Sequence, residues 1–216
     1  MLFLAFSENI MNYLTFRETF KDFTVISLAD IHGVDAGFHR RRLNEWQDKG
    51  YLTKIIKGYY RFSDTPLDEN ILFETANRIY APSYVSLEMA LSHYGFIPEA
   101  VYGITSAATR PTKTYSTAIG SFIYRSLKPR LFFGYRIETY GAQKHLALAS
   151  PEKAILDYLY LHPSMAGIED FNTLRLETET VGQKVREADF FTYLDRFGNQ
   201  ALTRRATLFW KYLNYA

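Results

Sequence analysis

The chain has 216 residues, of which 47% are apolar, so it can bury one large core or two of ordinary size. Its formal net charge of +2 is too small to indicate a class of partner. Local clusters of charge are more informative. Cysteine is absent from the sequence, which excludes disulfides, thiolate metal sites and cysteine nucleophiles.

The chain opens with the apolar run MLFLAF, which lacks the basic flank and the cleavage site of a signal peptide. No run approaches the roughly 18 apolar residues that span a bilayer. We therefore expect a cytoplasmic protein without a membrane partner. Apolar residues at helical spacing predict a first helix over residues 9–23 with one buried stripe. Met11 is an alternative to Met1 as the first residue of the protein.

Residues 24–62 have the order helix, turn, basic helix and hairpin. Ser27 is placed to cap a short helix, and a second helix is expected over residues 36–49, ended by Gly50. Lys57-Gly58 is a natural turn between the strand-like runs LTKII and YYRF. This order predicts a winged helix-turn-helix, in which the second helix enters the major groove of DNA.

The second helix has two distinct faces. Leu43 and Trp46 lie three residues apart and are expected to point inward, whereas the opposite face is polar. Arginine and asparagine on that face can make bidentate contacts with guanine and adenine edges, and cations on the hairpin can contact phosphates. The predicted DNA-binding residues are Arg40, Arg41, Arg42, Asn44, Lys54, Lys57 and Arg61.

The charge of this segment is concentrated. Residues 37–61 hold seven basic and two acidic side chains, a local charge of +5. A charge run alone usually means a solvated face on a domain of unrelated purpose. The order of helix, turn, basic helix and basic hairpin is more specific, and it favours double-stranded DNA as the partner.

A polar stretch, SDTPLDE, separates the predicted winged helix from the rest of the chain. We therefore expect a DNA-binding domain over residues 1–65 and a second domain over residues 66–216. The second domain is expected to start with one helix capped by Asp68 and another capped by Ser86.

The middle of the second domain, residues 101–148, consists of short aromatic or β-branched runs separated by proline or glycine. Such runs predict an antiparallel or mixed sheet. Ser150 and Pro151 then begin a helix, and further helices are expected near residues 168–174, 187–197 and 200–213. The predicted fold class is α+β: an N-terminal winged helix-turn-helix, then a mixed α/β domain with an aromatic-rich, mainly antiparallel sheet and C-terminal helices.

A second basic stretch lies in the sheet region, and no Asp or Glu interrupts it. Aromatic residues alternate with its cations, so strand alternation should send most of the rings inward and leave a basic surface. That surface would extend the phosphate contacts or meet another polyanion such as RNA. Its residues are Arg110, Lys113, Arg125, Lys128, Arg130 and Arg136.

Nothing in the sequence indicates an enzyme. The SPEK sequence at residues 150–153 offers a hydroxyl, a carboxylate and an amine, but a capped helix start explains it more simply. Glu88 and His93 lie five apart, which is wrong for two metal ligands on one helix face. Asp157 is expected to be paired or half-exposed rather than catalytic. There is no P-loop, Rossmann glycine pattern or nucleophile elbow, so we expect no metal and no cofactor.

The second half resembles a known family. The sequences SYVSLEMALSHYG, TSAATRPTKTY followed by G-x-F-x-Y, and SPEKAILD resemble AbiEi antitoxins of type IV toxin–antitoxin systems. The likeness covers most of residues 45–162, with KGYYRF at the place of the wing, while the extreme N-terminus departs from the family pattern.

The resemblance implies an autorepressor that binds inverted repeats upstream of its own operon through the winged helix. It also implies an antitoxin that counters a companion nucleotidyltransferase toxin without a stable complex. By position, the winged-helix face would be Arg40, Arg41, Asn44, Lys54 and Lys57, and the C-terminal domain would supply the antitoxicity.

Two alternatives stay open from the sequence. One is a winged-helix transcription factor whose C-terminal domain senses a ligand or partner, with no toxin involved. The other is an enzyme acting on nucleic acid, against which the absence of clustered carboxylates in the basic stretch argues. A long exposed seam is absent, so we expect a monomer in solution that pairs on DNA.

Overall fold

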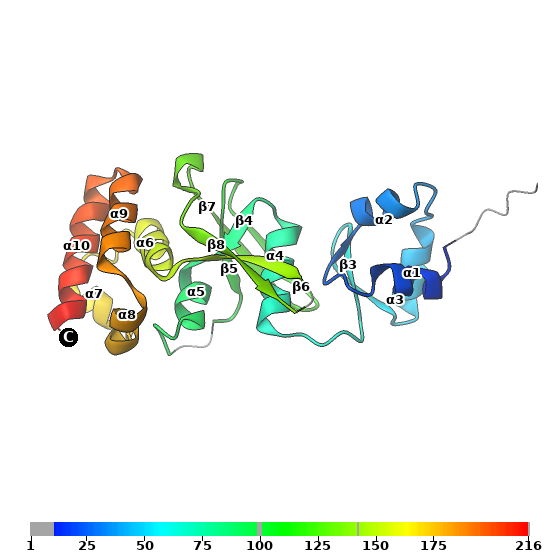
Figure 1. The fold of residues 1–216 in the computed structure, drawn as a ribbon, viewed down its shortest axis with the longest axis horizontal. Helices are drawn as coiled ribbons and strands as arrows, with labels where there is room; N and C mark the ends of the chain where they lie inside the picture. The colour runs from blue at the N-terminus through cyan, green and yellow to red at the C-terminus, as the bar shows by residue number, and fades with distance from the viewer. Residues whose placement is uncertain (1–10, 99–100, 142, 216) are drawn as a thin grey trace, which may run out of the picture. The chain divides into compact units, whose positions relative to one another are not determined.

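The computed structural model describes residues 11–98, 101–141 and 143–215 and shows an α+β protein (Figure 1). The chain packs as two compact units, Met1–Leu67 and Asp68–Ala216, and the division falls close to the boundary expected near residue 66. No helix in the described part is both long and apolar enough to cross a membrane. The MLFLAF run and the first two residues of the helix predicted from residue 9 lie outside the described residues.

The first unit contains three helices and three strands among its described residues. They are α1 (Tyr13–Phe20), β1 (Ile26–Ser27), α2 (Leu28–Val34), α3 (Arg41–Asp48), β2 (Leu52–Ile56) and β3 (Tyr59–Phe62). The strands form an antiparallel sheet in the order β1-β3-β2, which makes β3 the central strand.

Local sequence explains the ends of these elements. The Ser27 hydroxyl accepts from the Asp30 backbone N–H while the Asp30 carboxylate accepts from the Ser27 N–H, which forms the capping box of α2. Gly50 and Gly58 have φ values of 73° and 86°, which an L side chain rarely adopts, at the end of α3 and in the β2–β3 turn. The cap at Ser27, the end at Gly50 and the hairpin are therefore confirmed.

The start of α3 differs from the prediction. A helix was expected from residue 36, but α3 begins at Arg41. The Asp35 side chain accepts from the Gly37 N–H at 3.0 Å, and the Phe38 N–H donates to the Asp35 carbonyl at 3.1 Å. The residues expected to form the first helical turn therefore form a non-helical turn instead. Phe38 packs in the core, where it is 6% exposed.

An aromatic cluster forms the core of the first unit. Phe16 contacts Phe20, Phe38 and Trp46 with ring centroids 4.8, 6.1 and 4.7 Å away. The α1 stripe is narrower than predicted, because Leu14 is 77% exposed. Since α1 and α3 both pack on this cluster, the side chains on the outer side of α3 are left in solvent.

The second unit has a six-stranded mixed sheet in the order β6-β7-β5-β4-β9-β8, in which β4/β9 and β5/β7 are parallel. Its elements are α4 (Glu69–Ile79), β4 (Ser83–Val85), α5 (Leu87–His93), β5 (Ile104–Ala108), β6 (Lys113–Thr117), β7 (Gly120–Ser126), the short 3₁₀ turn η1 (Pro129–Leu131), β8 (Tyr135–Tyr140), β9 (Lys144–Ala149), α6 (Pro151–Leu161), α7 (Ile168–Asn172), α8 (Thr178–Lys184), α9 (Glu187–Phe197) and α10 (Gln200–Tyr215). The sequence predicted all of the helices except α8.

Helices α4 and α6 cover opposite faces of this sheet (Figure 1). The Tyr124 hydroxyl donates to the Ala76 carbonyl of α4, and the register places Tyr124 on the same face as Val85. Its neighbour Tyr84 points to the other face and donates to Asp157 of α6. Helices α9 and α10 pack on α6, so the C-terminal helices extend from the side of the sheet that α6 covers.

The predicted cap at Ser86 is only half correct. Ser86 precedes α5, but its hydroxyl makes no cap bond and donates instead to Asp157 at 3.0 Å. The hydroxyl of Thr105 takes its place, accepting from the Met89 N–H at 2.9 Å and donating to the Ser86 carbonyl at 2.8 Å. A residue of the neighbouring strand therefore caps the helix, which local sequence cannot reveal.

Candidate nucleic-acid interface

Helix α3 carries a polar face, formed by Arg40, Arg41 and Asn44. All three residues are exposed, whereas Leu43 and Trp46 on the other side of the helix are 0% and 5% exposed. The Arg41 side chain stays 88% exposed although its Nε lies 3.4 Å from the Glu45 carboxylate. The helix is thus anchored by apolar side chains and presents two guanidinium groups and an amide to solvent.

The hairpin adds two exposed cations. Lys54 lies on β2 opposite Tyr60, and Lys57 lies in the turn before Gly58. Neighbouring residues of a strand point to opposite faces, so Ile55 is buried while Lys54 remains in solvent. A bulge interrupts the register between Lys54 and Ile56. Both ammonium groups are available for contact with a polyanion.

Arg61 does not belong to this surface, contrary to the prediction. Its side chain is 4% exposed, because it lies on the central strand and the segment after β3 folds over it. Its guanidinium donates to the carbonyls of Thr65 and Pro66, and burial lowers its pKa. Arg61 therefore holds the segment after β3 in place at the end of the first unit.

Arg42 also has a structural role that the sequence did not indicate. It is half-buried, and its Nη1 donates to the backbone carbonyl of Met11, just before α1. Of the seven predicted DNA-binding residues, the five that stay exposed are Arg40, Arg41, Asn44, Lys54 and Lys57.

The second basic stretch does not form one continuous surface. Lys113 of β6 is paired with Tyr124 and shares its face of the sheet, whereas Arg125 follows Tyr124 and points to the opposite face. Arg136 lies on β8, at the other edge of the six-stranded sheet. Alternation and strand order thus separate cations that the sequence places close together.

The remaining cations of that stretch lie outside the strands. Arg110 follows β5 and places its guanidinium 4.1 Å from the centre of the Tyr80 ring. Lys128 and Arg130 are exposed at the 3₁₀ turn between β7 and β8. These positions give scattered positive charge and no defined groove.

A buried polar cluster of Tyr84, Ser86, Lys153 and Asp157 joins α6 to the sheet. Lys153 and Asp157 are both 0% exposed, one turn apart on α6, and form an ion pair. The hydroxyls of Tyr84 and Ser86 donate to the other carboxylate oxygen at 2.8 and 3.0 Å. Burial raises the pKa of Asp157 and lowers the pKa of Lys153.

Aromatic rings complete the enclosure of this buried polar cluster. The Lys153 Nζ lies 4.7 Å from the centre of the Phe197 ring, 4.9 Å from Phe133 and 5.6 Å from Tyr84. With no exposed atom at either charge, the cluster positions α6 and cannot reach a substrate. The Lys-to-Asp spacing of four on an apolar helix could have revealed the ion pair. The two hydroxyls come from β4 and from the residue between β4 and α5, far away in the sequence, and could not have been predicted.

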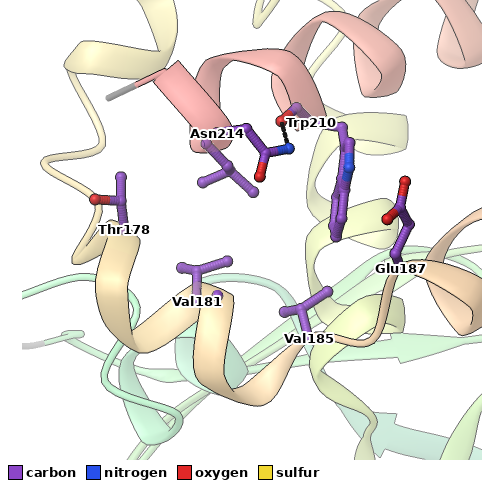
Figure 2. A pocket seen from close by; sticks show the side chains of 8 residues that line it. Thr178, Val181, Val185, Glu187, Trp210 and Asn214 are labelled. Carbon is purple, nitrogen blue, oxygen red and sulfur yellow. Dashed lines mark hydrogen bonds between the residues drawn. The ribbon is translucent and has the colours of Figure 1, made fainter.

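A small pocket lies between α8, α9 and α10, with a volume of about 240 Å³. Figure 2 shows Val181 of α8 and Val185, the residue after that helix, facing Trp210 and Asn214 of α10. Glu187, the first residue of α9, also lines it. The pocket combines apolar and polar lining residues, an indole ring and one acid, and no sequence pattern marked it.

Histidines pair with single carboxylates in the second unit. The His93 Nδ1 lies 2.7 Å from Glu69, and the His162 Nε2 lies 3.4 Å from Glu88. Across the described residues, no group of three or more His, Asp or Glu side chains is arranged to hold a metal ion.

Comparisons with known proteins bear on the fold. No family model matches the chain, and no curated protein matches it. The chain is similar to the crystal structure of the RV2827C protein from Mycobacterium tuberculosis, with a TM-score of 0.56 and 14% sequence identity. The similarity covers 88% of this chain and 72% of that chain. At this identity the two proteins share a fold, and the likeness extends to the fold alone.

Proposed function

We propose that the protein is a DNA-binding transcriptional regulator and that its first unit is a winged helix-turn-helix. The observation that carries the proposal is the α3 polar face, held outward by Leu43 and Trp46 in the core. The order α1, α2, α3 and then the β2–β3 hairpin supports it, because helices followed by a hairpin is the element order of a winged helix-turn-helix.

In this proposal α3 enters the major groove. Arg40 and Arg41 reach guanine O6 and N7, Asn44 reaches adenine N6 and N7, and the hairpin lysines contact phosphates. Arg42 and Arg61 act through the scaffold, because their guanidinium groups are already bonded to backbone carbonyls. Specific binding is thus assigned to three side chains and non-specific affinity to Lys54 and Lys57.

We further propose that the protein is an autorepressor and the antitoxin of a type IV module. The support is the resemblance of residues 45–162 to AbiEi antitoxins. It implies inverted repeats in the operator and a companion nucleotidyltransferase toxin countered without a stable complex. The antitoxic function is assigned to the second unit.

Binding to the DNA upstream of the coding sequence tests the regulatory proposal. The Arg40→Ala/Arg41→Ala variant should lose about 1–3 kcal/mol of specific binding for each base-reading arginine. Lys21→Ala, which removes an exposed cation paired with Glu18 on α1, is the control and should bind as the wild type does. Equal binding by the double variant and the control contradicts the assignment of α3.

Salt dependence separates the hairpin from the helix. Lys54→Ala should weaken binding to all sequences alike and lower the slope of log K against log salt by about 0.9 for one lost phosphate contact. Asn44→Ala should leave that slope unchanged and relax the preference at one base pair. Fluorescence anisotropy at several salt concentrations measures both quantities.

Co-expression with a neighbouring nucleotidyltransferase-like gene tests the antitoxin proposal. Growth should be rescued by the wild type and also by Arg40→Ala/Arg41→Ala, since antitoxicity is assigned to the second unit. If the wild type fails to rescue growth while repressing its own promoter, the antitoxin proposal is wrong and the regulatory one stands.

The pocket favours a second candidate, a regulator whose second unit senses a small molecule. Trp210 offers an indole ring and Glu187 a carboxylate, a combination that suits a small organic cation with an apolar body. Tetramethylammonium titration with tryptophan fluorescence as readout tests it, with Trp210→Phe as the control. Release of operator DNA at saturating ligand would favour this candidate over the antitoxin.

A further inference from the structure

Strand β8 lies at one end of the six-stranded sheet, and its outer edge pairs with no strand in the part of the chain that the structure describes. Its central residues, Arg136 to Thr139, are all exposed, and Ile137 is 62% exposed. An edge strand with unpaired backbone groups and an exposed apolar side chain is a template for another strand.

The side chains of β8 alternate between the two faces of the sheet, so its charged residues share one face. Arg136 and Glu138 point to one face of the sheet, and Ile137 points to the other. Neither Arg136 nor Glu138 forms an ion pair with another described residue. A cation and an anion two residues apart are therefore available on the same face of an edge strand.

This three-residue run is complementary to itself. In an antiparallel pairing of two copies with the two-fold axis at Ile137, Arg136 of each copy lies opposite Glu138 of the other. The same operation places the two Ile137 side chains opposite each other on the second face. Two ion pairs and one apolar contact then form from a single short segment.

The opposite edge of the sheet lacks this property. Strand β6 carries Lys113 but no acid. A two-fold axis at its central residue, Tyr115, would place Lys113 opposite Thr117 of the other copy. Charge complementarity to a second copy therefore distinguishes β8 from β6.

We propose that two copies of the chain associate through antiparallel pairing of their β8 strands and join their six-stranded sheets into one. The proposal is independent of DNA binding, and it replaces the expected monomer in solution with a weak dimer. A small edge interface of this kind should have a dissociation constant on the order of 1–100 μM. The dimer would carry two α3 helices, which suits an operator with inverted repeats.

Charge reversal tests the pairing. Arg136→Glu sets Glu opposite Glu138 of the partner, and Glu138→Arg sets Arg opposite Arg136, so each variant should dimerise about ten- to a hundredfold more weakly. The double variant Arg136→Glu/Glu138→Arg restores opposite charges and should dimerise as the wild type does. An equimolar mixture of the two single variants should form heterodimers, because each supplies the charge that the other needs.

Sedimentation velocity over a concentration series measures these equilibria, and a tag on one single variant allows the heterodimer to be captured. Lys113→Glu on β6 is the matched control, since it reverses a charge on the other edge strand and should leave the dimer intact. Thermal unfolding checks that every variant is folded. A wild type that stays monomeric up to about 100 μM overturns the proposal. A folded Arg136→Glu that dimerises as tightly as Lys113→Glu does, or a double variant that fails to recover, also overturns it.

Discussion

The two basic stretches, residues 37–61 and residues 110–136, differ in how the backbone distributes their charge. The first contains a helix, where Arg40, Arg41 and Asn44 fall on one side because the repeat is 3.6 residues. The second consists largely of strands, where alternation puts Lys113 and Arg125 on opposite faces. A run of cations becomes a surface only when its secondary structure gathers the side chains.

The two units also differ in how each one buries a positively charged side chain. In the first unit Arg61 is buried on the central strand, while Lys54 and Lys57 of the same hairpin are exposed. In the second unit Lys153 is enclosed by rings and paired with Asp157. Three predictions sharpen this comparison, starting with the largest expected effect.

The buried ion pair should dominate the stability of the second unit. Asp157→Ala leaves the Lys153 charge without its partner and removes the acceptor of two hydroxyls, so unfolding should become easier by about 3–5 kcal/mol. Lys153→Met/Asp157→Leu removes both charges and should cost less. Urea denaturation measures both free energies, and a double variant as unstable as the single one would show that packing matters more than charge.

Two cations of the hairpin should separate stability from binding. Arg61→Ala removes the bonds to Thr65 and Pro66, so unfolding should become easier by about 1–3 kcal/mol. Lys54→Ala should change stability by less than about 0.5 kcal/mol, because the side chain is exposed. Denaturation and DNA titration of both variants, under conditions where both are folded, should give opposite rankings. If folded Arg61→Ala loses as much DNA affinity as Lys54→Ala does, Arg61 is part of the DNA interface.

The exposed ion pair of the first unit should have the smallest effect. Arg17 lies 2.8 Å from Asp64, and the hydrogen bond holds the pKa of that carboxyl below its ordinary value of 3.8. The pair therefore stabilises the fold above pH 3.8 and loses its contribution as the pH falls through the lowered pKa. An exposed pair contributes about 0.2–1 kcal/mol.

Asp64→Asn provides the comparison for the exposed pair. The free energy of unfolding should differ between wild type and variant at pH 7, and this difference should shrink towards pH 2. A difference that grows on acidification would contradict the sign of the pKa change.

Several elements were predictable because their causes are local. The cap at Ser27, the glycine at position 50 and the Lys57-Gly58 turn follow from backbone conformations that few residues adopt. The start of α6 at Pro151 follows in the same way, since Ser150 accepts from the Lys153 N–H. Helix α8 was missed because its sequence, TETVGQK, has one buried apolar residue and no capping side chain.

The site was predictable where a helix set its geometry. The α3 polar face followed from spacing, since Leu43 and Trp46 mark the buried side. Arg61 was misassigned and the backbone bond of Arg42 was missed, because their partners are carbonyls of segments that fold back on them. Such contacts depend on the path of the whole chain, which composition and periodicity do not describe.

The sequence alone determined the α+β class, most of the elements and the polar side of α3, because each depends on neighbours within a few residues. Only the tertiary structure decided which cations reach solvent, which residue caps α5 and how the basic stretch of the sheet is divided. The reason is that strand order, register and chain reversals bring together residues far apart in sequence. Burial and hydrogen bonding at these long-range contacts then determine whether a charged side chain stabilises the fold or stays exposed to a partner.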